Sequence, residues 1–315
     1  MESVATKSNT TKTTEALCEI PAEVFIFPYS LVFLVSLVLN CITMWVYFCT
    51  NQRVQSSITV YMKNLVAADF LLCLCLPFRI AFYANPTGIM SIIYRSIGLT
   101  AFFINMYASI FFMDLIAMNR YLKITRPLET HTLQTVRTAR YISIAVWLFM
   151  LTMSSVYITT YFLASWGIVW GKFPFNYELL RVFYILINCV AFGFFIFILV
   201  SLIFFNWKTI QKLREVQLST QTDFNRQKFR KSKQNMLVLV VIFCVCFVPY
   251  HLVILPSIFI KPLLNDSTSI QALCILEEVT FLLVALSVSL DPLIYFFFSK
   301  VFREQINLMS CQNCI

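Results

Sequence analysis

Long apolar stretches alternate with short polar segments along the whole chain. Seven stretches are longer than the roughly 20 residues that a helix needs to cross about 30 Å of hydrocarbon. They lie near 25–50, 58–84, 91–124, 138–164, 178–211, 232–260 and 271–298. Each runs on continuously, without the alternation over about 10 residues that is typical of a membrane β-strand. No internal repeat of the kind found in many transporters is visible. The pattern predicts an all-α membrane protein with a bundle of seven transmembrane helices.

Composition agrees with this class and excludes others. Hydrophobic residues make up 59% of the 315 residues and charged residues 12%, which is about half the usual share of a soluble domain. A soluble enzyme of this length would have too little charge to cover its surface. The sequence contains no phosphate-binding loop, no HExxH or GxSxG motif, and only two histidines. We therefore expect no enzyme, and neither an organic cofactor nor a catalytic metal.

The distribution of charge predicts the orientation. With the N-terminus outside, the inner side holds 17 of the 24 Lys and Arg residues and a net charge of +13, against −1 on the outer side. Positive residues favour the cytoplasmic side. We expect an extracellular segment 1–24, a transmembrane domain 25–298, and an eighth helix with a cytoplasmic tail at 299–315, all in the plasma membrane. Contact with membrane lipids and inner partners accounts for the charge without nucleic acid.

Polar side chains interrupt the apolar stretches at Asn40, Asp69, Arg120 and Asp291. An ionisable group at the bilayer centre costs roughly 2.5–3.5 kcal/mol on insertion scales. One interpretation is that these residues hold helices together through buried hydrogen bonds. The other is a functional network, which their joint arrangement favours.

These residues belong to motifs that occur in one order. The motifs are Leu39-Asn40, Asn64-Leu65-Val66-Ala67-Ala68-Asp69, Asn119-Arg120-Tyr121, Trp147, Cys246-Phe247-Val248-Pro249-Tyr250-His251, Asp291-Pro292-Leu293-Ile294-Tyr295 and Phe302-Arg303. Over nearly its full length the chain resembles the rhodopsin-like (class A) G-protein-coupled receptors. Leu76-Pro77-Phe78-Arg79 and Asn105-Met106-Tyr107-Ala108-Ser109-Ile110 are similar to the purinoceptor-like branch, which includes the platelet-activating-factor receptor.

The resemblance implies several sites. The surface that couples to a heterotrimeric G protein, and that arrestin would also contact, contains Asn119, Arg120, Tyr121, Lys123, Arg126 and Pro127. The activation switch contains Phe247, Pro249, Asp291, Pro292, Tyr295 and Asn206, and its two prolines kink their helices. Asn40, Asp69 and Asp291 correspond to a network that holds a sodium ion or water, although Ser287 replaces an asparagine there. The ligand cavity contains Arg79, Phe103, Tyr107, Arg181, His251 and Glu277.

Two departures from the family pattern concern Arg120. The acid that normally precedes this arginine and pairs with it is Asn119 here. The inner part of the sixth span reads Phe229-Arg230-Lys231 and lacks the second acidic partner. Because both clamps are missing, we expect raised basal signalling. The alternative is a different inactive packing with ordinary ligand dependence.

The outer side also departs from the pattern. Arg95 stands where the family has a cysteine, and the loop expected at 165–177 contains none. Its aromatic residues are Trp166, Trp170, Phe173 and Phe175, with Tyr177 at its end. They form either an aromatic belt at the membrane surface or a plug that enters the binding cavity as a tethered agonist.

The cations that bind nucleotide phosphates in relatives are replaced by Ile254 and by Glu277, with Glu278 beside it. A polyphosphate needs several cations, so a nucleotide ligand is disfavoured. The outer cations that remain are Arg79, Arg95, Arg181 and Lys261. They either bind the single anionic group of a lipid-like ligand or extend to lipid headgroups. Asp114 is an unusual acid within the third span, either protonated or paired with an unidentified neighbour.

Covalent modification has its own candidates. Asn9 and Asn265 begin glycosylation sequons on the expected outer side. The resemblance implies a disulfide between Cys18 and Cys274. Cys311 and Cys314 follow the eighth helix and are candidates for palmitoylation. Their zinc-like spacing lacks a second pair of ligands.

Three functions stay open. The first is a receptor that passes an outer signal, or its own basal activity, to a G protein, with the basic third inner loop favouring the inhibitory class. The second is a decoy or scaffold receptor that does not couple, which Asn119 and the missing outer disulfide would suit. The third is a channel or transporter, which would require a polar pathway or broken helices.

Overall fold

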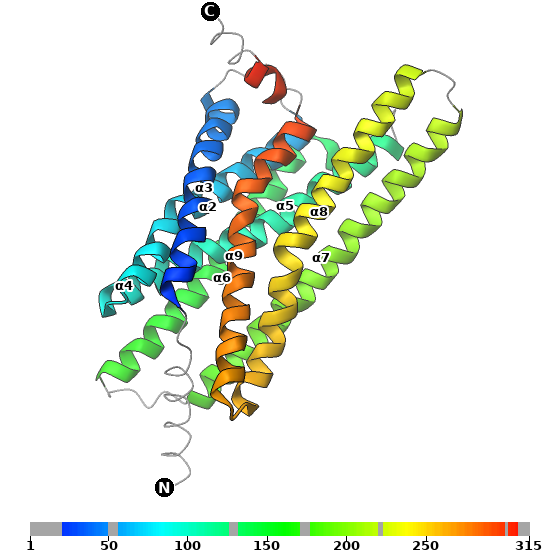
Figure 1. The fold of residues 1–315 in the computed structure, drawn as a ribbon. Helices are drawn as coiled ribbons and strands as arrows, with labels where there is room; N and C mark the ends of the chain where they lie inside the picture. The colour runs from blue at the N-terminus through cyan, green and yellow to red at the C-terminus, as the bar shows by residue number, and fades with distance from the viewer. Residues whose placement is uncertain are drawn as a thin grey trace, which may run out of the picture.

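The computed structural model describes residues 21–49, 56–125, 132–170, 177–219, 223–299 and 302–307. The described elements are α2 (Ala22–Met44), η1 (Trp45–Cys49), α3 (Ser57–Ala84), α4 (Gly88–Ile93), η2 (Tyr94–Gly98), α5 (Leu99–Thr125), η3 (Thr132–Gln134), α6 (Val136–Trp170), α7 (Tyr177–Ser219), α8 (Asp223–Ile260), η4 (Lys261–Leu263) and α9 (Ser267–Phe298). Residues 302–307 form a further short helix. Figure 1 shows one elongated bundle, in which α7 and α8 extend beyond the other helices at the end of the bundle where α9 ends.

Seven of these helical segments are long and apolar enough to cross a membrane. They are Glu23–Cys49, Ser57–Ala84, Gly88–Thr125, Val136–Thr159, Tyr184–Glu215, Arg230–Leu263 and Ser267–Phe298. The predicted number and order of spans are therefore confirmed. Following the expected orientation, we call the end of the bundle near the N-terminus the outer end and the opposite end the inner end.

Helix ends differ from the sequence prediction in α2, α6, α7 and α8. The first helix begins at Ala22, so residues 22–24 are part of it and not of the N-terminal segment. The helix α6, which contains the fourth span, continues to Trp170, so Trp166 and Trp170 lie on a helix and not in an outer loop. No proline interrupts 138–170, so nothing stops the helix at residue 164. The helices α7 and α8 continue past the apolar runs because Lys, Arg, Gln and Glu are good helix formers.

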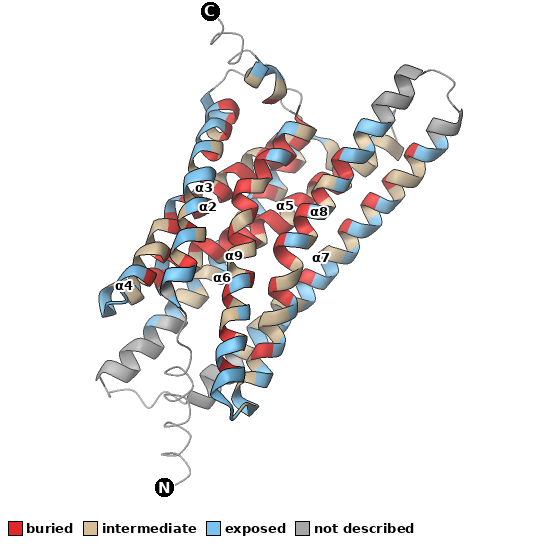
Figure 2. Ribbon diagram, in the orientation of Figure 1, coloured by how far each residue is buried: buried red, intermediate tan, exposed pale blue. Residues whose placement is uncertain are grey.

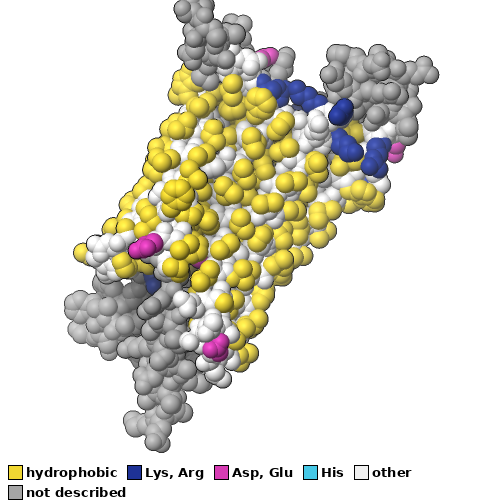
Figure 3. All heavy atoms as spheres, viewed as in Figure 1, with side chains coloured by type: hydrophobic (Ala, Val, Ile, Leu, Met, Phe, Trp, Pro, Cys, Tyr) yellow, Lys and Arg dark blue, Asp and Glu magenta, His cyan; other side chains and the backbone are white. Residues whose placement is uncertain are grey.

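Apolar side chains both fill the bundle and cover it. Buried residues line the interior (Figure 2), where α5 packs against α3, α6, α7 and α8. Large apolar side chains that are more than half exposed include Phe27, Leu148, Val190, Phe197 and Leu252. Figure 3 shows apolar side chains along the length of the visible face, with most of its Lys and Arg side chains near the inner end. Such a surface suits lipid and not water.

The third span contains the π-helical turn η2 between α4 and α5. A Cβ added to Gly98 would lie 2.7 Å from Cδ2 of the Tyr94 ring, closer than real carbon contacts. Glycine at this position therefore allows the Tyr94 ring to lie against the helix backbone. Turns of this kind often occur at functional sites, and Tyr94 is indeed part of the outer cluster described next.

Candidate functional site

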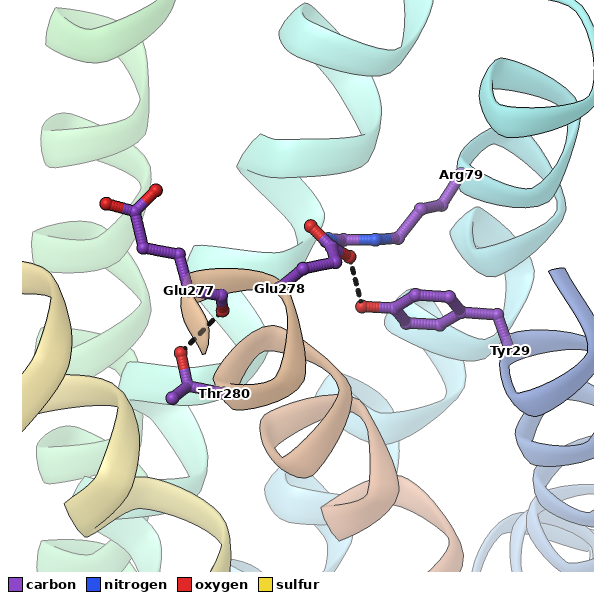
Figure 4. Close-up of polar contacts among 5 residues, drawn as sticks. All are labelled: Tyr29, Arg79, Glu277, Glu278 and Thr280. Carbon is purple, nitrogen blue, oxygen red and sulfur yellow. Dashed lines mark hydrogen bonds and ion pairs between the residues drawn. The ribbon is translucent and has the colours of Figure 1, made fainter. Parts of the chain in front are cut away.

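A buried ion pair between Arg79 on α3 and Glu278 on α9 lies at the outer end of the bundle. The two side chains are only 5% and 7% exposed. Arg79 Nη2 donates to Glu278 Oε1, and the hydroxyl of Tyr29 on α2 donates to the same oxygen at 2.7 Å (Figure 4). Three helices therefore meet at one carboxylate oxygen. Sequence reasoning treated Arg79 as a free cation and missed this partner.

Aromatic rings surround the guanidinium of Arg79. Its Cζ atom lies 4.7–5.9 Å from the ring centroids of Tyr29, Phe281, Tyr94, Phe102 and Tyr83. A guanidinium within about 6 Å of a ring centroid is attracted by the ring's quadrupole. We call Arg79, Glu278 and these five rings the outer cluster. A cavity beside it, about the size of one water molecule, is lined by Leu72, Cys75, Leu76, Arg79, Tyr94, Gly98 and Phe102.

The neighbouring acid, Glu277, lies on another side of α9. Its carboxylate accepts from Lys261 Nζ at 3.1 Å, and both side chains are partly exposed. Figure 4 shows the carboxylates of Glu277 and Glu278 leaving the helix in different directions. Glu277 is predicted to line the ligand cavity; the structure adds Lys261 as its partner, and its place in the cavity stays a prediction.

Three other predicted cavity residues, Phe103, Tyr107 and His251, pack against aromatic neighbours. The ring of His251 stacks on Phe195 with centroids 3.7 Å apart, and its Nδ1 lies 2.9 Å from the carbonyl oxygen of Phe247. Tyr107 lies edge-on to His251 at 5.9 Å, while Phe103 packs against other rings. His251 is buried, so its described contacts are those of a packed core residue.

A polar network lies deeper in the bundle. Asp69 accepts hydrogen bonds from Asn105 at 2.9 Å and from the Tyr295 hydroxyl at 2.7 Å. Asn40 donates to the carbonyl oxygens of Ser36 and Val288. The network therefore links α2, α3, α5 and α9. Asn105 was not assigned to it from the sequence, because only the fold brings the residue opposite Asp69.

Several acceptor oxygens in these helices have no donor among the residues that the structure describes. The carboxyl of Asp291 interacts with that of Asp69, and neither of its oxygens accepts a hydrogen bond from a described residue. Side-chain oxygens of Asn40, Asn105 and Ser287 are also buried without a partner among the described residues. Two adjacent carboxylates cannot both stay ionised without compensation. These oxygens therefore fit a bound cation, a shared proton or water molecules.

At the inner end, Arg120 is held by the end of α9. Its Nη2 donates to the carbonyl oxygen of Phe298 at 2.9 Å, and its Cζ lies 4.9 Å from the Phe298 ring centroid. No carboxylate pairs with Arg120 among the residues that the structure describes. Asn119 is buried and turns away, donating to Ser57 Oγ on α3 at 2.8 Å. The sequence did not predict the Phe298 carbonyl as a partner of Arg120.

The last carbonyl groups of α9 accept from three elements. Asn235 on α8 donates to the Phe297 carbonyl at 2.8 Å. Arg303 of the short helix donates to the carbonyls of Phe296 and Phe297. A helix leaves its final carbonyls without internal partners, and cations are favourable there. We call these contacts, with that of Arg120, the inner cap.

The remaining predicted residues on the inner half have local contacts. The ring of Tyr121 packs on Phe205 with centroids 5.5 Å apart, and Lys123 is exposed. Asn206 donates only to Leu202 of its own helix, at 2.7 Å, and has no described contact with Arg120. Asp114 has a partner after all, because Ser201 on α7 donates to it at 2.9 Å.

The two prolines of the predicted switch each lie inside a continuous helix, Pro249 in α8 and Pro292 in α9. Phe247 precedes the first of them, is fully buried and packs edge-on against Phe243 at 5.6 Å. Two further switch residues, Asp291 and Tyr295, lie in the polar network around Asp69.

Several predicted residues lie outside the described part of the chain. They are Asn9, Cys18, Arg126, Pro127, Phe173, Phe175, Cys311 and Cys314, together with the side chains of Trp166, Trp170 and Arg181. Cys274 is buried and disulfide-bonded, and its partner lies outside the described residues. Asn265 is exposed at the outer end. The roles of these residues remain predictions.

Comparison with known proteins extends over most of the chain. Residues 39–295 match the family model described as 7 transmembrane receptor (rhodopsin family). The chain is 30% identical to purinoceptor 14 of Bos taurus, covering 88% of this chain and 82% of that protein. It is 28% identical to lysophosphatidic acid receptor 6 of Mus musculus, covering 89% and 82%. It is 32% identical to G-protein coupled receptor 87 of Mus musculus, covering 88% and 77%.

These matches agree with the seven spans and with the branch that the motifs predicted. They identify a multi-pass protein of the plasma membrane, a receptor and not an enzyme, from a family whose partners are G proteins. The chain belongs to the rhodopsin family of seven-transmembrane receptors.

Proposed function

We propose that this receptor activates a heterotrimeric G protein and does so at a raised basal level without a ligand. The observation that carries the proposal is the environment of Arg120. Its described partners are a neutral carbonyl and an aromatic ring of Phe298, where the family usually provides a carboxylate. A hydrogen bond made by a charged group contributes about 1.5–3 kcal/mol, whereas breaking a buried ion pair costs about 3–5 kcal/mol.

Because the contacts of Arg120 are weaker than an ion pair, the free-energy difference between the conformations with a closed and an open inner end is smaller. Each 1.4 kcal/mol changes the ratio of the two states about ten-fold, so the open state is populated more often before any ligand binds. The inner surface, with Lys123 exposed next to Arg120, is then available to the G-protein α-subunit. We propose the inhibitory class, because the third inner loop is basic.

The test is ligand-free nucleotide exchange on purified G proteins of each α-subunit class. Asn119→Asp supplies the missing carboxylate and should lower basal exchange about ten-fold, equivalent to about 1.4 kcal/mol. Asn119→Ala is the matched control, because it removes the bond to Ser57 without adding charge, and should keep basal exchange raised. Arg120→Ala should abolish exchange.

Absence of exchange by the unsubstituted receptor with every α-subunit class would overturn the proposal and favour a decoy or scaffold receptor. Equal effects of Asn119→Asp and Asn119→Ala would show that charge is not the cause.

For the outer site, we propose a ligand with one anionic group and an apolar chain in preference to a nucleotide. One relative is named a lysophosphatidic acid receptor and another a purinoceptor. The outer cations with described side-chain partners are Arg79 and Lys261, each beside a glutamate. A polyphosphate would require more unpaired positive charge than these provide.

We further propose that the oxygens around Asp69 and Asp291 take up one sodium ion or share one proton. The unpartnered oxygens of Asn40, Asn105, Ser287 and Asp291 support this. Ligands of this kind are the hard oxygen donors that such a cation prefers. Asp69 and Asp291 would hold the charge, and their neighbours would orient them.

A further inference from the structure

The positive charge of Arg79 is already satisfied by the chain itself. We propose that Glu278 is a built-in counter-ion, which occupies an anion site made by Arg79 and its five surrounding rings and excludes a ligand from it. The inference rests on the proposed ligand class and narrows it: in the unsubstituted receptor the Glu278 carboxylate supplies the anionic group at Arg79, so a ligand of that class binds there only when Glu278 is neutralised. It does not depend on G-protein coupling.

The contacts of Glu278 are those that an anionic ligand would make. Two donors from different helices, Arg79 Nη2 and the Tyr29 hydroxyl, converge on a single carboxylate oxygen. A third donor, Arg79 Nε, is buried and has no partner among the described residues. A guanidinium binds carboxylate or phosphate best with two of its N–H groups at once. The site therefore retains donor capacity that Glu278 does not use.

The space beside Arg79 requires that a ligand displace Glu278. The adjacent cavity has room for about one water molecule, which is too little for a phosphate group. Its lining beyond Arg79 is mainly apolar and includes Leu72, Leu76 and Phe102. One anionic group at the end of an apolar chain matches this lining, whether the anion comes from a lipid headgroup or from free phosphate.

Glu277 is not placed to pair with Arg79 if the Glu278 carboxylate is displaced. It is directed elsewhere on α9 and pairs with Lys261 at 3.1 Å. The two acids are adjacent glutamates on the same turn of α9, but among the described residues Arg79 pairs with Glu278 and not with Glu277. Glu277→Gln is thus a matched control for Glu278→Gln.

The experiment measures thermal unfolding of the full-length receptor in detergent, without G protein. The probes are oleoyl lysophosphatidic acid, the uncharged monooleoylglycerol, and inorganic phosphate. Glu278→Gln should gain stability with lysophosphatidic acid, by about 5 °C at roughly 100 times its Kd. Monooleoylglycerol should give no shift. A shift with inorganic phosphate as well would show that the anion alone suffices, and a shift with the lipid only would show that the chain is needed.

The unsubstituted receptor, Glu277→Gln, and the double variant Arg79→Gln/Glu278→Gln should show no lysophosphatidic acid shift. An equal shift in the unsubstituted receptor, or none in Glu278→Gln, would overturn the proposal. If Glu278→Gln folds only when lysophosphatidic acid is present during solubilisation, this rescue would support the proposal. Failure of Glu278→Gln to fold under all conditions, while the double variant folds, would count against it. None of these outcomes depends on whether the receptor couples.

Discussion

Two arginines of this receptor, Arg79, which is buried, and Arg120, which is partly buried, have different surroundings. Arg79 at the outer end pairs with the carboxylate of Glu278, whose same oxygen also accepts from the Tyr29 hydroxyl. Five aromatic rings surround the Arg79 guanidinium. Arg120 at the inner end has one backbone carbonyl and one ring. The ion pair at Arg79 joins three helices and is costly to break, whereas Arg120 has no carboxylate partner among the described residues. We therefore expect the inner end to open more readily than the outer end.

The largest effect should come from disrupting the outer pair. Arg79→Gln or Glu278→Gln leaves one buried charge alone and should destabilise the receptor by about 3–5 kcal/mol. The double variant Arg79→Gln/Glu278→Gln should regain most of this loss, because no charge is then left unpaired. Thermal unfolding in detergent without lipid additives measures all three. Additive losses in the double variant would show that the two residues do not depend on each other, and the outer arginine would then be no better compensated than the inner one.

An intermediate effect is expected at Gly98. An alanine there places its Cβ against the Tyr94 ring, and overpacking typically costs about 1–3 kcal/mol. The ring would move from its place 5.4 Å from the Arg79 Cζ. Gly88→Ala is a suitable control, because nothing lies within 4 Å of its added Cβ. Equal unfolding temperatures for the two variants would show that the outer cluster does not depend on the Tyr94 position.

The smallest effect should come from Asn235 in the inner cap. Asn235→Ala removes one hydrogen bond to the Phe297 carbonyl, which contributes about 1 kcal/mol. Basal nucleotide exchange should rise a few-fold while the unfolding temperature hardly changes. A loss of stability as large as that from Arg79→Gln would contradict the contrast between the two ends.

The fold was predictable because apolar length determines it directly. Seven continuous runs give seven spans, whatever the packing between them. Helix ends were less predictable, since the polar residues of α7 and α8 continue a helix beyond the membrane. The helix α6 likewise runs to Trp170, because no proline stops it.

The site was predictable only in part. Asp69, Asp291 and Arg120 stood out because charge is rare in an apolar run. The pairing of Arg79 with Glu278 did not, because 199 residues separate them. Adjacent glutamates point about 100° apart on a helix, so the rotation of α9 alone decides which one meets Arg79. The bond from Arg120 to the Phe298 carbonyl could not be predicted from the sequence, because every residue has a backbone carbonyl.

Two carbonyls of the inner cap differ in their number of described donors. The Phe297 carbonyl has two described donors, Asn235 and Arg303, so α8 can withdraw without leaving that carbonyl unpaired. The Phe298 carbonyl has one described donor, Arg120. Its release leaves the guanidinium and this carbonyl both in need of new partners. We therefore expect a movement of α8 away from the acceptor of Asn235 to cost less free energy than the release of Arg120.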